Sequence, residues 1–397
     1  MRVTVDRFPR IAAFIVATAI ALTGIQGAAP AWAAPVTTAT PTISGTAQVG
    51  QTLTADPGTW TPGDTTFSYQ WKRGSTNVGT DSATYVVAAA DVGSTITVTV
   101  TGSATGYDAA SDVSAATSTV INGVFGTQPT PTISGTAQVG QTLTATAGTW
   151  VTTPTTLSYQ WKRGSTNVGT DTSTYVVGAA DVASTITVTV TASKSGYDSV
   201  SKVSASTSSV INGTFTSTPT PTIAGTAQVG QALTATAGTW APGGATLSYQ
   251  WKSGGTNVGT DSSTYVVAAS DIAATITVTV TATLSGYTSA NQTSAATSAV
   301  IEGVFTTAPT PTISGTAKVG QTLTATAGSW LPTPTSVGYQ WLRDGSTISG
   351  ATISTFVLTT ADLGHFITVT TTATRSGFAR WRSGRSARSA RSPALSR

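Results

Sequence analysis

The chain alternates hydrophobic and polar residues in short runs. Residues 96–100 (ITVTV) place Ile96, Val98 and Val100 on one side and threonines on the other. This two-residue period is typical of a half-buried β-strand. Residues 67–71 (FSYQW) alternate aromatic and polar side chains in the same way. Turn-forming residues separate such runs, and no run shows a helical period, so the pattern predicts antiparallel sheets.

The whole pattern repeats every 90 residues. The string PTISGTAQVGQTLTA begins at Pro41 and returns almost unchanged three more times. Residues 41–130 and 131–220 are identical at 67 of 90 positions without a gap. A period this long predicts tandem whole domains rather than the stacked units of a solenoid. About 90 residues are enough for a domain with its own core.

Within the first copy the alternation predicts six or seven short strands with turn signals every 8–12 residues, which is typical of an antiparallel β-sandwich. The strands are expected at Pro41–Gly45, Gln51–Ala55, Phe67–Trp71, Tyr85–Val87, Ile96–Val100 and Ser114–Val120.

Several positions of this copy resemble an immunoglobulin-like fold. Trp71 lies where that fold keeps its strand C tryptophan, and Leu53 and Val98 stand at the positions of its two half-cystines. Asp91 opens a turn before the strand that holds Val98. The strings ISGTAxVGQTLTA, GTW, YQW, ITVTV and SGY together resemble the Ig-like repeat family of secreted and surface proteins in Gram-positive actinobacteria. The resemblance covers residues 41 to about 378, and it implies a modular spacer or adhesive unit rather than an activity.

The chain is therefore predicted to be all-β, with four tandem immunoglobulin-like antiparallel β-sandwich domains in an elongated array of ~150 Å. The expected parts are a signal peptide at 1–33, Ig-like repeats at 38–123, 129–213, 219–303 and 309–378, of which the fourth lacks its last strand, and a basic Arg/Ser-rich, disordered tail at 379–397.

The first residues have the pattern of a secretory signal peptide. Arg2, Arg7 and Arg10 precede an apolar segment at residues 11–25, and Ala31-Trp32-Ala33 matches a cleavage site. The alternative is a membrane anchor, but this apolar segment is shorter than the ~20 residues of a membrane-spanning helix. We expect a secreted, extracellular protein, free or associated with the cell surface, with no transmembrane segment in the mature chain.

The amino-acid composition excludes several kinds of chemistry and of partner. The chain has no cysteine, which excludes disulfides and thiol catalysis. Residues 34–374 carry nine basic and 14 acidic side chains, so the repeats present no basic face and no nucleic acid partner is expected. The excess of arginine lies in the tail. This tail could contact anionic lipid or an anionic polymer such as teichoic acid. The alternative for the tail is a frameshifted or truncated reading frame.

One tryptophan of each copy precedes a variable loop, at Trp60, Trp150, Trp240 and Trp330. An exposed indole at such a place could stack on a sugar ring, so these four residues are the candidate ligand-stacking positions. The alternative is that they cover one open end of each sandwich. An aromatic residue after a glycine, at Tyr107, Tyr197, Tyr287 and Phe378, could extend the platform or pack in a corner of the fold.

Two further features suggest sites. An aspartate recurs at Asp91, Asp181, Asp271 and Asp362; it could bind calcium or, as we favour, cap a turn. Lys72 and Asn77, which recur in the next two copies, have the residue types of an isopeptide cross-link, although the fourth copy has Leu342 in place of the lysine.

No catalytic group recurs. His365 is the single histidine and aligns with Ser94, Ser184 and Ala274, so it is expected on turn surface. One histidine without cysteine makes a zinc site or a catalytic triad improbable, and no metal, cofactor or catalytic residue is expected.

The sequence therefore favours a secreted, non-enzymatic structural or adhesive repeat protein, acting as a spacer with multivalent weak binding at the cell envelope. Its expected partners are cell-wall or extracellular polysaccharide, or other surface proteins. The alternative is a carbohydrate-binding accessory protein or the remnant of an exported polysaccharide hydrolase.

Overall fold

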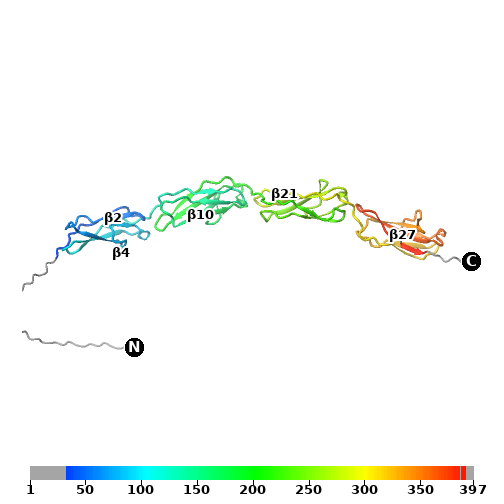
Figure 1. The fold of residues 1–397 in the computed structure, drawn as a ribbon, viewed down its shortest axis with the longest axis horizontal. Coiled ribbons are helices and arrows are strands. Elements are labelled where there is room, and N and C mark those ends of the chain that lie inside the picture. The colour runs from blue at the N-terminus through cyan, green and yellow to red at the C-terminus, as the bar shows by residue number, and fades with distance from the viewer. Residues whose placement is uncertain (1–32, 385, 390–397) are drawn as a thin grey trace, which may run out of the picture. The chain divides into compact units, whose positions relative to one another are not determined.

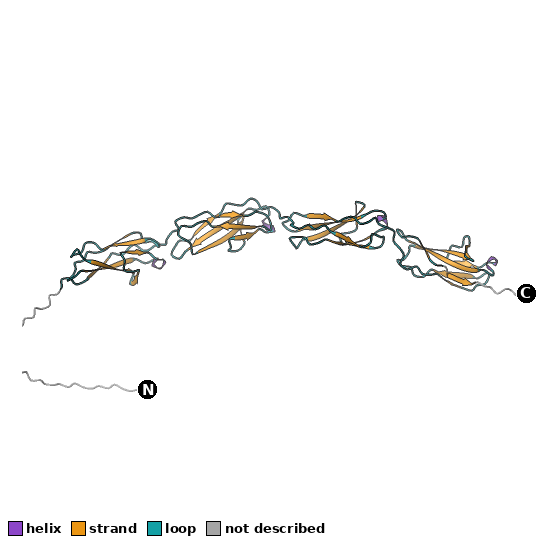
Figure 2. Ribbon diagram, viewed as in Figure 1, coloured by secondary structure: helices purple, strands orange, loops and turns teal. Residues whose placement is uncertain are grey.

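The computed structural model describes residues 33–384 and 386–389 (Figure 1). These residues form strands joined by turns, and their helical segments are short 3₁₀ turns (Figure 2). Residues 1–32 of the expected signal peptide at 1–33 and the last residues of the basic tail lie outside the described residues.

The first copy forms two sheets that face each other across its core. The smaller sheet has the order β1-β2-β5, and its strands are β1 (Thr42–Ser44), β2 (Thr52–Asp56) and β5 (Thr84–Val86). The larger sheet has the order β4-β3-β6-β7, and its strands are β3 (Thr66–Arg73), β4 (Thr76–Val78), β6 (Ile96–Ser103) and β7 (Ala110–Val113). The pairs given for these strands are antiparallel.

The other copies repeat both sheets. The small sheets consist of β8 (Thr132–Ser134), β9 (Thr142–Thr146) and β12 (Thr174–Val176); of β15 (Thr222–Ala224), β16 (Ala232–Thr236) and β19 (Thr264–Val266); and of β22 (Thr312–Ser314), β23 (Thr322–Thr326) and β26 (Thr355–Val357). The large sheets consist of β10 (Thr156–Arg163), β11 (Thr166–Val168), β13 (Ile186–Ser193) and β14 (Val200–Val203); of β17 (Thr246–Ser253), β18 (Thr256–Val258), β20 (Ile276–Thr283) and β21 (Ala290–Thr293); and of β24 (Ser336–Arg343), β25 (Ser346–Thr347) and β27 (Phe366–Thr374) with two further strands.

The alternating residues fill the space between the sheets. Leu53, Trp71 and Val98 are fully buried, and Trp71 and Val98 are direct partners between β3 and β6. The indole of Trp71 stacks on Tyr85 with ring centroids 5.6 Å apart and donates from Nε1 to the Ser82 carbonyl at 2.8 Å. The predicted fold class, tandem Ig-like antiparallel β-sandwiches, is confirmed.

The end of copy 4 differs from the expected loss of its last strand. Strand β28 (Trp381–Arg382) pairs with β27 in the register that β7 has on β6. Strand β29 (Ser386–Ser389) continues along β27. Ser383 supports the edge, because its Oγ accepts the Thr371 backbone N–H at 3.2 Å. The described part of the tail thus extends the sheet, because backbone pairing requires no particular side chain.

The described chain divides into two compact units, and the division falls inside copy 2. The first unit runs to Pro129 and also includes Thr149–Leu157 and Thr191–Ser201. The second consists of Thr130–Gly148, Ser158–Val190 and the chain from Lys202. Loop segments of copy 2 therefore pack with copy 1 in one unit.

Candidate functional site

The four candidate stacking tryptophans are buried. Trp60, Trp150, Trp240 and Trp330 expose only 5–7% of their surface. Each meets a phenylalanine edge to face with ring centroids 5.4–5.7 Å apart; the partners are Phe67, Phe125, Phe215 and Phe305. The indole faces are thus covered by protein, which is the arrangement of the alternative interpretation, and a sugar could stack on them only after the end of the sandwich opened.

The hydrogen bonding of the indole N–H group differs between copies. Trp60 donates from Nε1 to the Pro57 carbonyl at 2.6 Å. The Nε1 atoms of Trp150, Trp240 and Trp330 are buried without a hydrogen-bond partner. A buried donor without a partner carries a desolvation cost, so in three copies the indole N–H is the group that a polar ligand atom would satisfy.

Hydroxyl-lined hollows lie near this end of two copies. Beside Trp330, a pocket of about 450 Å³ is bordered by Ser329, Thr333, Thr335 and Ser336. In copy 1, a hollow of about 270 Å³ lies between the loop at Asp64 and the end of β6. Both offer hydroxyl groups that can donate to or accept from a neutral polar ligand.

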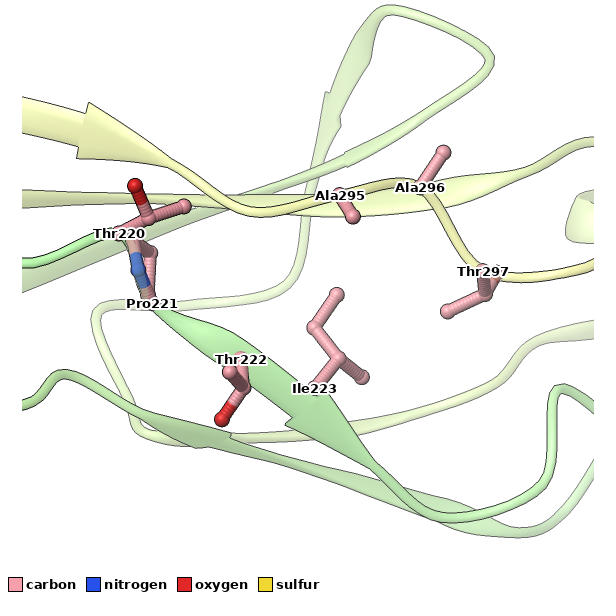
Figure 3. A pocket seen from close by; sticks show the side chains of 7 residues that line it. All are labelled: Thr220, Pro221, Thr222, Ile223, Ala295, Ala296 and Thr297. Carbon is pink, nitrogen blue, oxygen red and sulfur yellow. The ribbon is translucent and has the colours of Figure 1, made fainter.

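A third pocket lies along the side of copy 3 (Figure 3). It measures about 370 Å³ and lies between β15 and the segment that follows β21. Ile223 lies between these two segments in Figure 3. Threonine, proline, isoleucine and alanine residues line the pocket. With no titratable group in its wall, the pocket can accept an apolar or hydroxyl-bearing group but supplies no acid or base.

The recurring aspartate caps a buried turn. Asp91 ends the 3₁₀ turn η1 (Ala89–Asp91) and is fully buried. Its Oδ2 accepts from the Tyr85 hydroxyl at 2.6 Å and from the Ala88 backbone N–H at 2.8 Å. Arg73 lies 3.4 Å from Oδ1. Burial, followed by the hydrogen bond to Asp91, raises the pKa of Tyr85, so the phenol stays protonated and donates.

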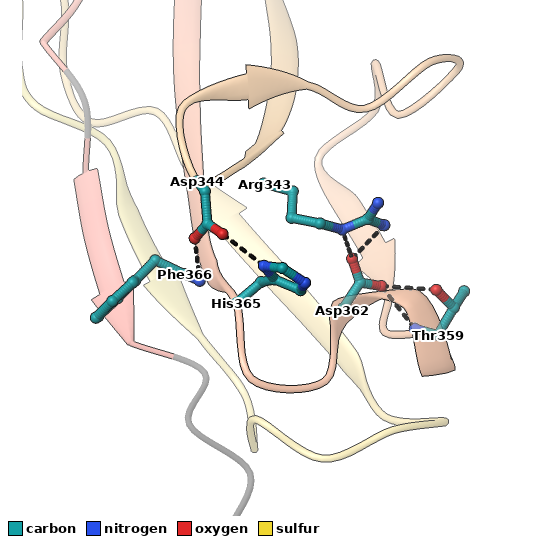
Figure 4. A network of polar contacts seen from close by, with 6 residues as sticks. All are labelled: Arg343, Asp344, Thr359, Asp362, His365 and Phe366. Carbon is teal, nitrogen blue, oxygen red and sulfur yellow. Dashed lines mark hydrogen bonds and ion pairs between the residues drawn. The ribbon is translucent and has the colours of Figure 1, made fainter.

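This network varies among the copies. Asp181 and Asp271, in η2 (Ala179–Asp181) and η3 (Ala269–Asp271), keep the tyrosine donor, but copy 3 has Ser253 where copy 1 has Arg73. In copy 4 Phe356 replaces the tyrosine. There the Thr359 hydroxyl donates to Asp362 at 2.8 Å instead (Figure 4).

In copy 4 the arginine lies closer to the aspartate than it does in copies 1 and 2. Arg343 donates from Nε to Asp362 Oδ1 at 2.7 Å, and its Nη2 forms an ion pair with the same oxygen (Figure 4). Burial would raise the pKa of Asp362, but the hydrogen bonds from Thr359 and Arg343 outweigh burial and lower it. The aspartate sits in η4 (Thr360–Asp362). In each copy Oδ2 of the aspartate accepts from two protein donors, and the described residues contain no group of three acidic or histidine side chains suited to a metal.

His365 lies on the surface, as expected. Its Nδ1 is 2.5 Å from Asp344 Oδ2, and both side chains are about half exposed (Figure 4). The Phe366 backbone N–H donates to the other carboxylate oxygen at 2.8 Å. The hydrogen bond from His365, followed by that from Phe366, lowers the pKa of Asp344. Lys72 and Asn77 are direct partners across β3 and β4, outside the buried core.

The aromatic residue after the recurring glycine joins one copy to the next. Tyr197 of copy 2 lies over Gly50 and Gly123, where an added Cβ would overlap its ring. It also packs on Phe125 with ring centroids 5.7 Å apart. The backbone adds a second contact, because Gly123 donates to the Gly196 carbonyl at 2.8 Å. We call Val49, Gly50 and Gly123, with their equivalents, the aromatic seat.

The aromatic seat recurs within the second compact unit. Tyr287 lies over Gly140 and Gly213, and Phe378 lies over Gly230 and Gly303. The matching backbone hydrogen bonds, from the second glycine of each seat to the carbonyl before the ring, measure 2.9 and 2.8 Å. Sequence reasoning offered these rings as a platform or as corner packing. The signal that could have identified the seat is the recurrence of its two glycines.

Comparisons with known proteins do not show a family for this chain. No protein-family model matches the chain, and no curated protein sequence matches it. Among solved structures, a Ca²⁺-stabilized adhesin that helps an Antarctic bacterium reach out and bind ice is 14% identical, with a TM-score of 0.26, over 89% of this chain and 99% of that one.

Two further solved structures are similar to the same degree. The D1–D4 ectodomain fragment of ICAM-5 is 14% identical with a TM-score of 0.25, over 86% of this chain and 95% of that one. The four N-terminal Ig domains of a Dscam1 isoform are 12% identical with a TM-score of 0.21, over 87% and 99%. In the part of the chain that the structure describes, no helix has the length and hydropathy to cross a membrane.

Proposed function

We propose that this chain is a secreted, non-enzymatic repeat protein that acts as a spacer and adhesive at the cell envelope, of the kind found in Gram-positive actinobacteria. The observation that carries the proposal is the aromatic seat. Tyr197, Tyr287 and Phe378 each pack a copy directly onto the one before it. Direct contact between neighbouring copies fixes the distance between them, whereas a flexible linker would let that distance vary.

The contact with a partner would be weak and repeated. Four copies of one surface raise the strength of attachment without a new contact, provided that the partner is itself repetitive. Cell-wall or extracellular polysaccharide has this property, as do other surface proteins in an array. The basic tail would add contact with an anionic polymer.

A second candidate is a carbohydrate-binding accessory protein, or the remnant of an exported polysaccharide hydrolase. Two observations favour it: the buried, unpartnered Nε1 of Trp330 and the hydroxyl groups around the adjacent pocket. A sugar hydroxyl that reached this pocket could accept from the indole while donating to Thr333 or Thr335.

Retention on insoluble peptidoglycan, chitin, cellulose and starch, compared between the native chain and tryptophan variants, tests the second candidate. The carbohydrate-binding candidate predicts retention on one polymer and its loss in a Trp330→Phe variant, which keeps a ring but removes the N–H. The same substitution at Trp60, whose N–H is already bonded inside the protein, is the matched control. If Trp330→Phe leaves retention unchanged, or if no polymer retains the chain, the second candidate is wrong; absence of retention would also remove polysaccharide from the expected partners of the spacer.

A further inference from the structure

Among the described residues, two halves of the aromatic seat lack their counterpart, the ring of copy 1 and the seat glycine of copy 4. In copies 1 to 3 the seat is filled by the ring of the following copy. The ring of copy 1 is Tyr107, which is 43% exposed, whereas Tyr197 and Tyr287 are partly buried. In the described part of the chain, nothing lies within 4 Å of a Cβ added to Gly320, the seat glycine of copy 4.

The apolar floor of the fourth seat is correspondingly open. Val319 is 37% exposed, while its equivalents Val49, Val139 and Val229 are 5% exposed. The backbone is nevertheless preformed, because Gly320 has a φ of 85° and the glycines of the filled seats have 84–86°. Gly320 thus keeps the backbone conformation over which a ring lies in the other three copies, while the position equivalent to Gly123 lies outside the described residues.

We propose that the two free halves bind each other between chains, so that Tyr107 of one molecule occupies the seat at Val319 and Gly320 of a second copy of this chain. This contact would have the same geometry as the three contacts between neighbouring copies within one chain. Because donor and seat are different surfaces, the interface is heterologous, and each added molecule again presents one free ring and one free seat. The product is a head-to-tail string of chains.

The association is expected to be weak. The contact consists of one ring, one valine and nearby backbone, which is far smaller than the ~1,600 Å² of a stable interface. Inside the chain, covalent linkage supplies the high effective concentration that makes such a contact form. Between free chains we expect a dissociation constant on the order of 1 mM, which becomes effective where molecules are crowded side by side on an envelope or polymer.

A photocrosslinking experiment tests the contact directly. Tyr107 is replaced by p-benzoylphenylalanine in the mature chain, residues 34–397, and the protein is irradiated at concentrations up to about 1 mM. We expect chain-to-chain products whose cross-linked peptides map to residues 317–320. Val319→Asp should lower their yield at least tenfold, because the ring would bury an unpaired charge. Val357→Asp, at an exposed valine of the same copy, is the matched control and should leave the yield unchanged.

Sedimentation of mixed variants tests the polarity of the contact. Tyr107→Ser and Val319→Asp chains should each remain monomeric alone, whereas their mixture should form pairs and stop there. Circular dichroism confirms that both variants are folded, and Val319→Ser serves in place of Val319→Asp if the latter is not. Cross-links scattered over the surface, yields unaffected by Val319→Asp, or no product at about 1 mM would each overturn the inference. None of these outcomes bears on the spacer proposal, which requires contacts only within one chain.

Discussion

The hydroxyl of Tyr197 occupies the space that a side chain at Gly50 would need. The two residues are 147 positions apart in the sequence and belong to different copies, yet they lie in one compact unit. Gly50 has a φ of 84°. Glycine adopts this conformation freely, whereas an L-residue adopts it at a cost in free energy. The position therefore requires glycine for two reasons, its backbone conformation and the ring above it.

A pair of glycine substitutions separates these two reasons. Gly50→Ala adds a Cβ under the Tyr197 ring, whereas Gly320→Ala adds one at the same φ with nothing above it. Both pay a left-handed backbone strain of ~1 kcal/mol, and Gly50→Ala should cost ~1–3 kcal/mol more because the ring must move. Hydrogen exchange of copies 1 and 4 in the intact chain measures both losses. Equal losses would mean that the ring contributes nothing to the stability of the contact.

Replacing the ring itself gives a second prediction. Copy 4 uses Phe378 for the same contact, so Tyr197→Phe should change the free energy of unfolding by less than ~0.5 kcal/mol. Tyr197→Ser removes the apolar ring and should cost ~2 kcal/mol. Limited proteolysis should then cleave the connection at residues 121–127 faster in the serine variant alone. A phenylalanine variant that is cleaved as fast as the serine variant would contradict the role of the ring.

The aspartate turn predicts a rescue between copies. Tyr85→Phe removes one donor to the buried Asp91 and should destabilise copy 1 by ~1–3 kcal/mol. Copy 4 carries Phe356 at this position and supplies the missing hydroxyl from Thr359. Adding Ala88→Thr to Tyr85→Phe should therefore restore part of the loss, as measured by hydrogen exchange of the turn. A double variant no more stable than Tyr85→Phe would show that the hydroxyl is not what the aspartate requires.

Acid should weaken copy 4 through Asp362. The pKa of this carboxyl is lower in the folded protein than its ordinary value, so the folded state favours the charged form. Its contribution to stability is complete above the unfolded pKa of about 3.9 and is lost as the pH falls through the lower folded pKa. The hydrogen-exchange protection factors of copy 4, which compare each amide with its exchange rate in an unfolded peptide at the same pH, should fall as the pH is lowered below about 4. Asp362→Asn is the control; it should be less stable at neutral pH and should keep only the smaller pH dependence that comes from Asp344.

The fold could be predicted from the sequence because the residues that the alternating pattern places on the inner side of each strand are the residues of the core. Leu53, Trp71 and Val98 lie at inward positions of a two-residue period, and all three are fully buried. Their roles depend on local alternation and on packing within one copy. The 90-residue repeat then extends the same argument to the remaining copies.

The candidate site was less predictable than the fold, because it depends on contacts between residues that are distant in the sequence. The burial of Trp150 results from Phe125, which comes from the connection before its own copy. A tryptophan beside a variable loop has the same local sequence whether it is covered or exposed. The role of Tyr197 depends on Gly50, and the sequence has no local signal that pairs a ring with a seat in the preceding copy.

The central claim is that direct contacts between copies make this chain a spacer, and small-angle X-ray scattering of the mature protein tests it most directly. The repeat predicts a particle of about 150 Å in length. Removing all three rings, as Tyr197→Ser, Tyr287→Ser and Phe378→Ser, should leave the individual sandwiches folded while the scattering changes to that of a flexibly linked chain. A compact globule, or identical curves for the two proteins, would contradict the account.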